Sequence, residues 1–310
     1  MARASHVISF SLKWSRIYLN GVILPFEYYI NGKMSVIKIA SYIDHTLLKP
    51  TATHIDINKI CNEALVYGFA AVCVPPPLVK LARSLVVAGI GEDGEDMVGG
   101  ADDADGAGRG GEGGEGTGAG EQAGDLTGAR GAAAAAGAER LVKVATVIGF
   151  PFGYSTTKAK LAEVAQAITD GADELDIVIN LVALKEGDWS QLEEEMRVLT
   201  EPAHAAGKIV KVIIESGILT DEEIIHCCSV YSRVGVDFLK TSTGYAEKGA
   251  TVAAVRLMRE HLPPRVKIKA SGGIRDYTFA AALVEAGADR LGCSASVEIV
   301  KMEHPAPGGY

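Results

Sequence analysis

The ten residues Val236–Tyr245, reading V-D-F-L-K-T-S-T-G-Y, join a short apolar strand to a polar turn. The apolar run ends in Lys240, and small residues follow at once. An isolated ammonium group is poorly tolerated in a medium of low dielectric constant, so this lysine either reaches the surface or has a use. The second possibility is an amine held at the mouth of a barrel, where it can attack a carbonyl group.

The chain around this stretch repeats one unit, an apolar strand followed by an amphipathic helix. Eight strands alternate with eight helices, which predicts parallel β-α-β units closed into a (β/α)8 TIM barrel. A doubly wound open sheet is the alternative, and it is disfavoured because no G-x-G-x-x-G follows the first strand. The strands are expected at 39–48, 69–74, 141–148, 174–180, 209–215, 236–240, 266–270 and 290–293, and the helices at 53–68, 78–88, 156–171, 189–206, 221–233, 251–261, 277–287 and 296–301.

One segment, 92–139, interrupts this pattern between the second helix and the third strand. It contains 16 glycines and 12 alanines in 48 residues, with 12 acidic against 2 basic side chains. Such a segment cannot bury enough apolar surface to offset its ordering entropy, so we expect a disordered insert on the face opposite the active site. The barrel domain is then 34–304, interrupted by the insert, and 305–310 is expected to be a mobile tail.

The first 33 residues differ in composition from the barrel. They contain several serines and the basic side chains of Arg3, Lys13 and Arg16, with no acidic residue before Glu27. This composition is weakly typical of an organellar transit peptide; the alternative is an upstream, poorly structured segment with Met34 as the start. No apolar run approaches the roughly 20 residues of a membrane span.

Cysteines and charges exclude several classes of protein. The five cysteines are irregularly spaced without a CxxC pair, which argues against a disulfide framework and a structural metal site and predicts a reducing, cytoplasmic compartment. Outside the insert, 27 acidic residues nearly balance 28 basic ones, and no basic stripe with interleaved aromatic residues indicates nucleic-acid binding.

Charged side chains at the predicted strand ends indicate the chemistry. Lys240 and Lys269 end adjacent strands, which lie roughly 4.8 Å apart in a sheet, so one ammonium group lowers the pKa of the other. Asp176 points inward on its own strand and can balance the second lysine and transfer protons. The alternative is an ion-pair network that plugs the barrel, and Lys211 and Lys267 share the inward face of their strands.

Glycine-bearing turns after the last three strands form a second signal. Thr243–Gly244, Gly272–Gly273 and Gly292-x-Ser294 let backbone N–H groups approach an anion. TIM barrels often bind phosphate with the loops after strands seven and eight, and Arg275 could add a charged hydrogen bond. These turns predict a phosphate site.

Six stretches of the chain, in order, resemble the deoxyribose-phosphate aldolase family. The resemblance covers Ile37 to about Lys301 apart from the insert. The stretches are Tyr42–Pro50 (Y-I-D-H-T-L-L-K-P), Val142–Gly153 (V-K-V-A-T-V-I-G-F-P-F-G), Asp173–Asn180 (D-E-L-D-I-V-I-N), Val212–Glu215 (V-I-I-E), Phe238–Gly244 (F-L-K-T-S-T-G) and Lys267–Ile274 (K-I-K-A-S-G-G-I).

The resemblance implies a class I aldolase on a (β/α)8 barrel that uses neither metal nor cofactor. It implies reversible cleavage of 2-deoxy-D-ribose 5-phosphate to acetaldehyde and D-glyceraldehyde 3-phosphate. By motif, Lys240 is the Schiff-base lysine, Lys269 the second lysine that keeps its pKa low, and Asp176 the general acid/base partner. Gly272, Gly273 and Ser294 match the phosphate-binding turns.

Three points stay open at this stage. Some family members end in a mobile tail whose last residue is a tyrosine that assists proton transfer, so Tyr310 is either a proton relay or part of a frayed terminus. The alternative functions are a class I aldolase for another phosphosugar, or a non-catalytic barrel whose acidic insert recruits partners. A homodimer is one candidate assembly, although no helix face is distinctive enough to decide it.

Overall fold

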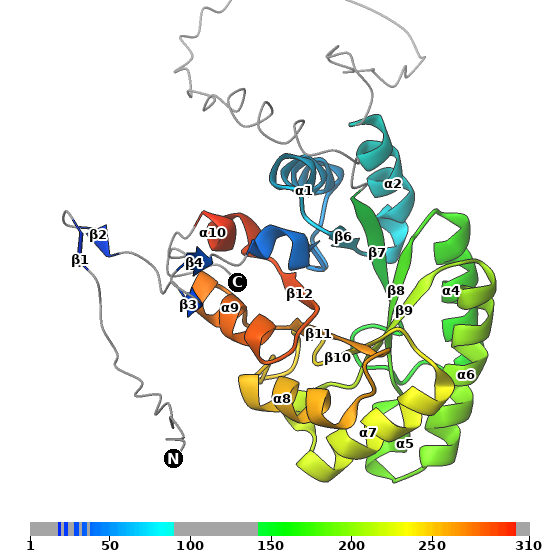
Figure 1. Ribbon diagram of the computed structural model, residues 1–310. Helices are drawn as coiled ribbons and strands as arrows, with labels where there is room; N and C mark the ends of the chain where they lie inside the picture. The colour runs from blue at the N-terminus through cyan, green and yellow to red at the C-terminus, as the bar shows by residue number, and fades with distance from the viewer. Residues whose placement is uncertain are drawn as a thin grey trace, which may run out of the picture.

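The computed structural model describes residues 38–89 and 142–301, together with the backbone of four short strands between Tyr18 and Ser35. Its centre is a closed barrel in which the strands follow the order β10–β11–β12–β5–β6–β7–β8–β9, and helices surround it (Figure 1). The predicted (β/α)8 barrel is therefore confirmed. The barrel strands are β5 (Ile43–Thr46), β6 (Ala71–Val74), β7 (Lys143–Ile148), β8 (Glu174–Val178), β9 (Ile209–Ile213), β10 (Phe238–Lys240), β11 (Lys267–Ser271) and β12 (Arg290–Cys293).

The helices follow the strands in the predicted alternation. They are α1 (His54–Tyr67), α2 (Val79–Ala88), α4 (Thr157–Thr169), α5 (Leu181–Lys185), α6 (Trp189–Ala205), α7 (Asp221–Val234), α8 (Val252–His261), α9 (Tyr277–Glu285) and α10 (Ser296–Val300), with 3-10 turns η1 (Ile39–Tyr42), η2 (Pro76–Leu78) and η3 (Ser216–Ile218). Ahead of the barrel, β1 (Tyr18–Leu19) pairs with β2 (Val22–Ile23), and β3 (Tyr28–Ile30) with β4 (Lys33–Ser35), both antiparallel. The insert 92–139, the tail 305–310 and most of residues 1–33 lie outside the described residues.

Local sequence determines where α1 begins and ends. The Thr53 side chain accepts a hydrogen bond from the Asp56 N–H, while the Asp56 carboxylate accepts one from the Thr53 N–H, which forms a capping box. Gly68 ends the helix with φ of 67°, a left-handed conformation that glycine adopts without steric cost. Thr220 and Gly235 bound α7 in the same way, so this helix begins at Asp221, as predicted.

The short helix α5 is the main departure from the predicted elements. The fourth strand was expected to continue to Asn180, but β8 ends at Val178. Asn180 instead caps α5, because its side-chain oxygen accepts hydrogen bonds from the N–H groups of Val182 and Ala183. Asparagine is a strong N-cap residue, and this capping competes with extension of the strand.

Strand register places charged side chains inside the barrel and apolar ones outside it. Lys240 lies directly opposite Lys269, and Asp176 opposite Lys211. The alternate residues Leu239 and Ile268 belong to the apolar core. This period of two is expected for parallel strands. The barrel thus has an apolar layer under the helices, and inside it the charged side chains lie beside a small apolar cluster of Ala71, Cys73, Ala145 and Val147.

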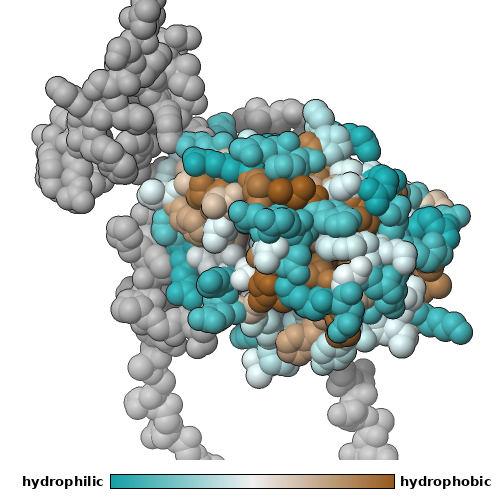
Figure 2. Space-filling model, turned by 90° about the horizontal axis from the view of Figure 1, so that it is seen from below, coloured by the Kyte–Doolittle hydropathy of each residue, from teal (hydrophilic) through white to brown (hydrophobic). Residues whose placement is uncertain are grey.

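The described helices are amphipathic, so the outer surface of the barrel is largely hydrophilic. Figure 2 shows one outer face, on which hydrophilic residues surround narrower apolar strips. No helix within 38–89 or 142–301 is long and apolar enough to cross a membrane. The segment between Gly89, after α2, and Val142, before β7, joins a helix to the amino end of a strand, which is the barrel face opposite the carboxyl strand ends.

Candidate active site

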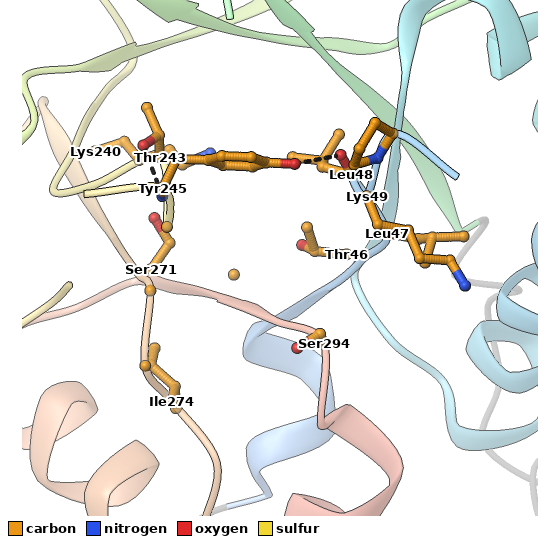
Figure 3. A pocket seen from close by; sticks show the side chains of 15 residues that line it. Thr46, Leu47, Leu48, Lys49, Lys240, Thr243, Tyr245, Ser271, Ile274 and Ser294 are labelled. Carbon is orange, nitrogen blue, oxygen red and sulfur yellow. Dashed lines mark hydrogen bonds between the residues drawn. The ribbon is translucent and has the colours of Figure 1, made fainter. Parts of the chain in front are cut away.

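A pocket of about 780 Å³ opens at the carboxyl ends of four consecutive barrel strands, β10, β11, β12 and β5. This is the face on which TIM-barrel enzymes carry their active sites. The strand ends and the loops that follow them supply the lining (Figure 3). The lining residues are Thr46, Leu47, Leu48, Lys49, Pro50, Lys240, Thr243, Gly244, Tyr245, Ser271, Gly272, Gly273, Ile274, Gly292 and Ser294.

Lys240 is the inner lysine that lines the pocket, and it belongs to a cluster of three charged groups. Its Nζ atom donates a hydrogen bond to Asp176 Oδ2 at 2.7 Å. Lys269 Nζ donates to the same oxygen, also at 2.7 Å, and lies 2.5 Å from Asp44 Oδ2. Lys269 and Asp176 are completely buried and do not line the pocket. The barrel interior therefore brings the three predicted catalytic residues together. Lys240 ends β10 and lines the pocket, whereas Lys269 and Asp176 lie within β11 and β8.

A second layer of charge lies next to these residues. Lys211 Nζ contacts Asp176 Oδ1 at 2.8 Å and Glu174 Oε2 at 2.6 Å. The Arg290 guanidinium bridges Asp44 and Glu174. We call the full set the interior charge network; its members are Asp44, Glu174, Asp176, Lys211, Lys240, Lys269 and Arg290.

The interior charge network holds four basic groups and three carboxyl groups. Full ionisation of all seven would leave one uncompensated positive charge inside the barrel, which is costly in a low dielectric. One neutral lysine restores the balance. Lys240 is the member for which neutrality costs least, because it is the lysine with the fewest carboxylate contacts in the network.

The pKa shifts agree with this charge count. Burial and the Lys269 ammonium lower the pKa of Lys240, and they outweigh the opposing effect of Asp176. Burial alone would lower the pKa of Lys269, but the carboxylates of Asp176 and Asp44 raise it. Burial would likewise raise the pKa of Asp176, yet Lys211, Lys240 and Lys269 hold it well below its usual range. The cluster thus favours a neutral amine on Lys240 beside an ionised Lys269–Asp176 pair.

The glycine turns line the same pocket as the apolar residues Leu47 and Leu48. Gly272 and Gly273 have φ of 88° and 77°, a conformation that L side chains rarely adopt. A Cβ atom at Gly272 would lie 3.0 Å from Gly249 Cα, so the backbone of the neighbouring loop approaches closely here. Exposed backbone in such turns is suited to an anion.

Most of the residues predicted to bind phosphate line the pocket, but Arg275 does not. Thr243, Gly244, Gly272, Gly273 and Ser294 line the pocket. Arg275 is exposed and is not among the lining residues. Tyr310 lies outside the described residues.

Sequence reasoning missed two parts of the site. Leu47–Pro50 and Tyr245 line the pocket, although the stretches Tyr42–Pro50 and Val236–Tyr245 had already been singled out in the sequence. Arg290 and Glu174 lie at the beginnings of β12 and β8 and belong to the inner layer. Their charge inside apolar strands was the available signal. Of the two further lysines considered, Lys211 joins the network, whereas Lys267 is exposed and its Nζ lies 5.6 Å from the Phe238 ring centre.

Metal binding was also considered for the described residues. Within 38–89 and 142–301, no group of three or more His, Cys, Asp or Glu side chains is arranged to hold a metal ion. The three inner carboxylates are each contacted by lysine or arginine side chains instead.

Comparison with known proteins places these features in a family. Residues 126–299 match the family model described as DeoC/LacD family aldolase. The chain is 43% identical to the deoxyribose-phosphate aldolase of Thermococcus gammatolerans, over 85% of this chain and 95% of the relative. It is 41% identical to deoxyribose-phosphate aldolase 1 of Bacillus licheniformis, with the same two coverages.

Solved structures show the same fold. The aldolase QR15 superposes with a TM-score of 0.66 at 33% identity, covering 86% of this chain and 96% of that one. The deoxyribose phosphate aldolase of Aeropyrum pernix, whose structure is described as tetrameric, gives a TM-score of 0.63 at 28% identity, with coverages of 85% and 89%.

Proposed function

This chain belongs to the DeoC/LacD family of aldolases, and on that premise we propose that Lys240 is the amine through which it acts as a deoxyribose-phosphate aldolase. The enzyme is a lyase that reversibly cleaves 2-deoxy-D-ribose 5-phosphate to acetaldehyde and D-glyceraldehyde 3-phosphate. The observation that carries the assignment of Lys240 is the shared oxygen of Asp176, which accepts hydrogen bonds from both Lys240 and Lys269 while Lys240 alone of the three lines the pocket.

The first half of the reaction attaches the sugar to the enzyme. The neutral Lys240 amine adds to the C1 carbonyl of the open-chain sugar, and loss of water leaves a protonated imine. Asp176 lies 2.7 Å from Lys240 Nζ, close enough to exchange protons with the attacking nitrogen. Lys269 keeps Asp176 ionised and helps to keep Lys240 neutral.

The second half breaks the carbon–carbon bond. The hydroxyl on C3 loses its proton, the C2–C3 bond breaks, and its electron pair moves to the imine, which releases glyceraldehyde 3-phosphate and leaves an enamine on Lys240. Protonation of the enamine at C2 and addition of water then release acetaldehyde and return the free amine. We assign the proton transfers to Asp176 together with Lys269, because these two ionised groups contact each other and Asp176 also contacts Lys240.

The phosphate is assigned to the turns after β11 and β12. Gly272, Gly273 and Ser294 line the pocket there, and Thr243 and Gly244 face them from the loop after β10. Turns that expose backbone N–H groups bind phosphate without a dedicated charge. Arg275 lies two residues before the start of α9, where we propose that it contributes to the positive potential at the rim.

The experiment that tests this function is reductive trapping with acetaldehyde and borohydride. The expected result is one ethyl group on Lys240, located by peptide mass spectrometry, in an enzyme that cleaves 2-deoxy-D-ribose 5-phosphate. Label on another lysine would contradict the assignment of Lys240. Trapping without cleavage of this sugar would point to a class I aldolase for a different phosphosugar.

The lowered pKa of Lys240 predicts a specific pH dependence. Only the neutral amine attacks, so the rate of imine trapping should rise as pH rises through the pKa of Lys240 and reach its midpoint below the ordinary value of 10.5. Lys269→Met removes an ammonium that lowers this pKa, so the midpoint should move to higher pH. Trapping rates at a series of pH values measure both. Lys267→Met, on the same strand but exposed, is the control, and an unmoved midpoint in Lys269→Met would contradict the repulsion.

A further inference from the structure

Tyr245 spans the mouth of the pocket. It follows β10, and its hydroxyl donates a hydrogen bond at 2.9 Å to the carbonyl oxygen of Leu48, which follows β5. Its ring also packs edge to face with the Phe150 ring, with the two ring centroids 5.4 Å apart. Figure 3 shows the ring extending from the Thr243 side of the pocket to Leu48. The bridge therefore joins loops that are 197 residues apart in the sequence.

The bridge between Tyr245 and Leu48 crosses the side of the barrel that carries the proposed phosphate turns. Between β10 and β5 the strand order contains β11 and β12. The turns after these two strands carry Gly272, Gly273 and Ser294. A contact from the loop after β10 to the loop after β5 thus passes the turns to which the phosphate is assigned.

A chain of hydrogen bonds fixes Tyr245 from behind. The Tyr245 N–H donates to Thr243 Oγ1 at 3.1 Å. The Thr243 N–H donates to both carboxylate oxygens of Glu215, at 3.2 and 3.3 Å, and the Thr243 hydroxyl donates to one of them. Glu215 is 3% exposed. The carboxylate therefore holds the turn that begins at Thr243 and carries Tyr245.

Glu215 itself has an unusual backbone. With φ of 55° and ψ of 53°, it is the one residue other than glycine with positive φ in the described ranges. Hydrogen bonds on either side tie it to the lysine strand, from the Ile214 N–H to Lys240 O and from the Ser216 N–H to Thr241 O. This backbone conformation is disfavoured for a residue that has a side chain unless the surrounding structure fixes it. Residues in such conformations are concentrated at functional sites.

The far end of the same loop is also anchored. The Ala250 N–H donates to Ser271 O at 3.0 Å and to Gly272 O at 3.1 Å. A Cβ atom at Gly249 would lie 2.2 Å from Gly272 O, so only glycine fits there. Tyr245 thus stands in a loop held at one end by Glu215 and at the other by the turn at Gly272.

We propose that Tyr245 is a clasp across the pocket, and that Glu215 is a positioning residue that holds this clasp through Thr243. The proposal rests on the function given above. The clasp retains the phosphate-bearing end of the sugar against the turns after β11 and β12. Acetaldehyde has no such end, so its addition to Lys240 does not depend on the clasp.

The test separates binding from chemistry in purified variants of the full chain. Tyr245→Phe keeps the ring and removes the hydrogen bond to Leu48, and should raise KM for 2-deoxy-D-ribose 5-phosphate about fivefold with kcat within about twofold. Glu215→Asn is too short to reach Thr243 but suits positive φ, so it should raise KM similarly with little loss of thermal stability. Glu215→Gln keeps one acceptor and should lie between Glu215→Asn and the parent.

A double-mutant cycle tests whether the two residues act together. If Glu215 acts through Tyr245, Glu215→Asn with Tyr245→Phe should raise KM no further than the larger single effect. Independent structural damage would instead multiply the two effects. Trapping of acetaldehyde on Lys240 should stay at the parent rate in every variant. Glu63→Gln is the control, since this glutamate accepts a hydrogen bond from His45 outside the pocket and should leave KM unchanged.

The outcomes distinguish this proposal from the function on which it rests. A parent enzyme that neither cleaves the sugar nor is trapped would overturn the proposed function. A parent enzyme that does both, with KM unchanged in Tyr245→Phe, would overturn the clasp alone. The positioning role of Glu215 would be overturned if the increases in KM multiply in the double variant. It would also be overturned if kcat and the trapping rate fall by the same factor as KM rises.

Discussion

Replacing Lys240 with leucine is expected to abolish cleavage, lowering kcat by on the order of 10⁴-fold or more, while the barrel stays folded. The loss follows from the mechanism, because among the described residues that line the pocket Lys240 is the lysine in contact with Asp176. Lys49 is the other lysine of the lining, and it lies on the loop after β5, where its Nζ is 3.4 Å from Asp56. The trapped ethyl label should disappear together with the turnover.

The charge count explains why the fold should survive this change. Without Lys240, the interior charge network contains three carboxylates, from Asp44, Glu174 and Asp176, and three cations. Asp176 keeps its contacts to Lys211 and Lys269. Leucine also replaces a buried polar group with an apolar one of smaller volume. We therefore expect a free energy of unfolding within about 1 kcal/mol of the parent value.

Lys267 offers a matched control for Lys240→Leu, because it lies on the neighbouring strand. Lys267→Leu removes a lysine from the neighbouring strand whose side chain is exposed and lies over the Phe238 ring. It should keep both turnover and labelling. Retained turnover in Lys240→Leu, or labelling of a different lysine in the parent, would show that another residue supplies the amine.

The sequence was sufficient for the barrel and for the strand-end residues because both depend on local signals. Strand–helix alternation and capping residues such as Thr53 and Gly68 report on segments of a few residues each. In a parallel barrel, every strand delivers its carboxyl end to the same face. Lys240, Lys269 and Asp176 could therefore be placed near one another inside the barrel without knowledge of any contact between them, although Lys269 and Asp176 lie within their strands and not at the rim.

The rest of the site depends on contacts between distant parts of the chain. Arg290 reaches Asp44 across 246 residues and Glu174 across 116, and neither neighbour can be recognised from the residues around Arg290. Strand parity placed Lys211 and Lys267 on equivalent inward faces, and both pair with Phe238. Only the structure shows that Lys211 is buried and Lys267 is exposed. The bridge from Tyr245 to Leu48 likewise depends on loop geometry that no local pattern encodes.

Asp176→Asn should affect both activity and stability, in contrast to Lys240→Leu. The amide cannot carry the negative charge that Lys211, Lys240 and Lys269 all contact. Removing one partner from a buried ion network typically costs about 3–5 kcal/mol, and denaturant titration should show a loss of that size. Turnover should fall about 10³-fold because the proton transfers lose their carboxylate. Asp237→Asn, which changes a partly exposed aspartate at the amino end of β10, is the isosteric control.

The chemical consequence of Asp176→Asn should differ from that of removing the lysine. Asp176 raises the pKa of Lys240, so its loss makes the Lys240 amine more readily neutral. Acetaldehyde should therefore still be trapped on Lys240 after long incubation, although catalytic turnover is lost. A variant that loses trapping completely while it remains folded would mean that Asp176 is needed for the attack itself.

A second substitution can separate the two roles of Asp176. In Asp176→Asn, the carboxylates of Asp44 and Glu174 face the cations of Lys211, Lys269 and Arg290 if Lys240 is neutral. Adding Lys211→Met removes one cation and restores an equal count, so the double variant should recover most of the lost stability. Turnover should not recover, because the carboxylate beside Lys240 is still absent. Recovery of both would show that Asp176 serves only to balance charge, and recovery of neither would show that the network does not act through its charge count.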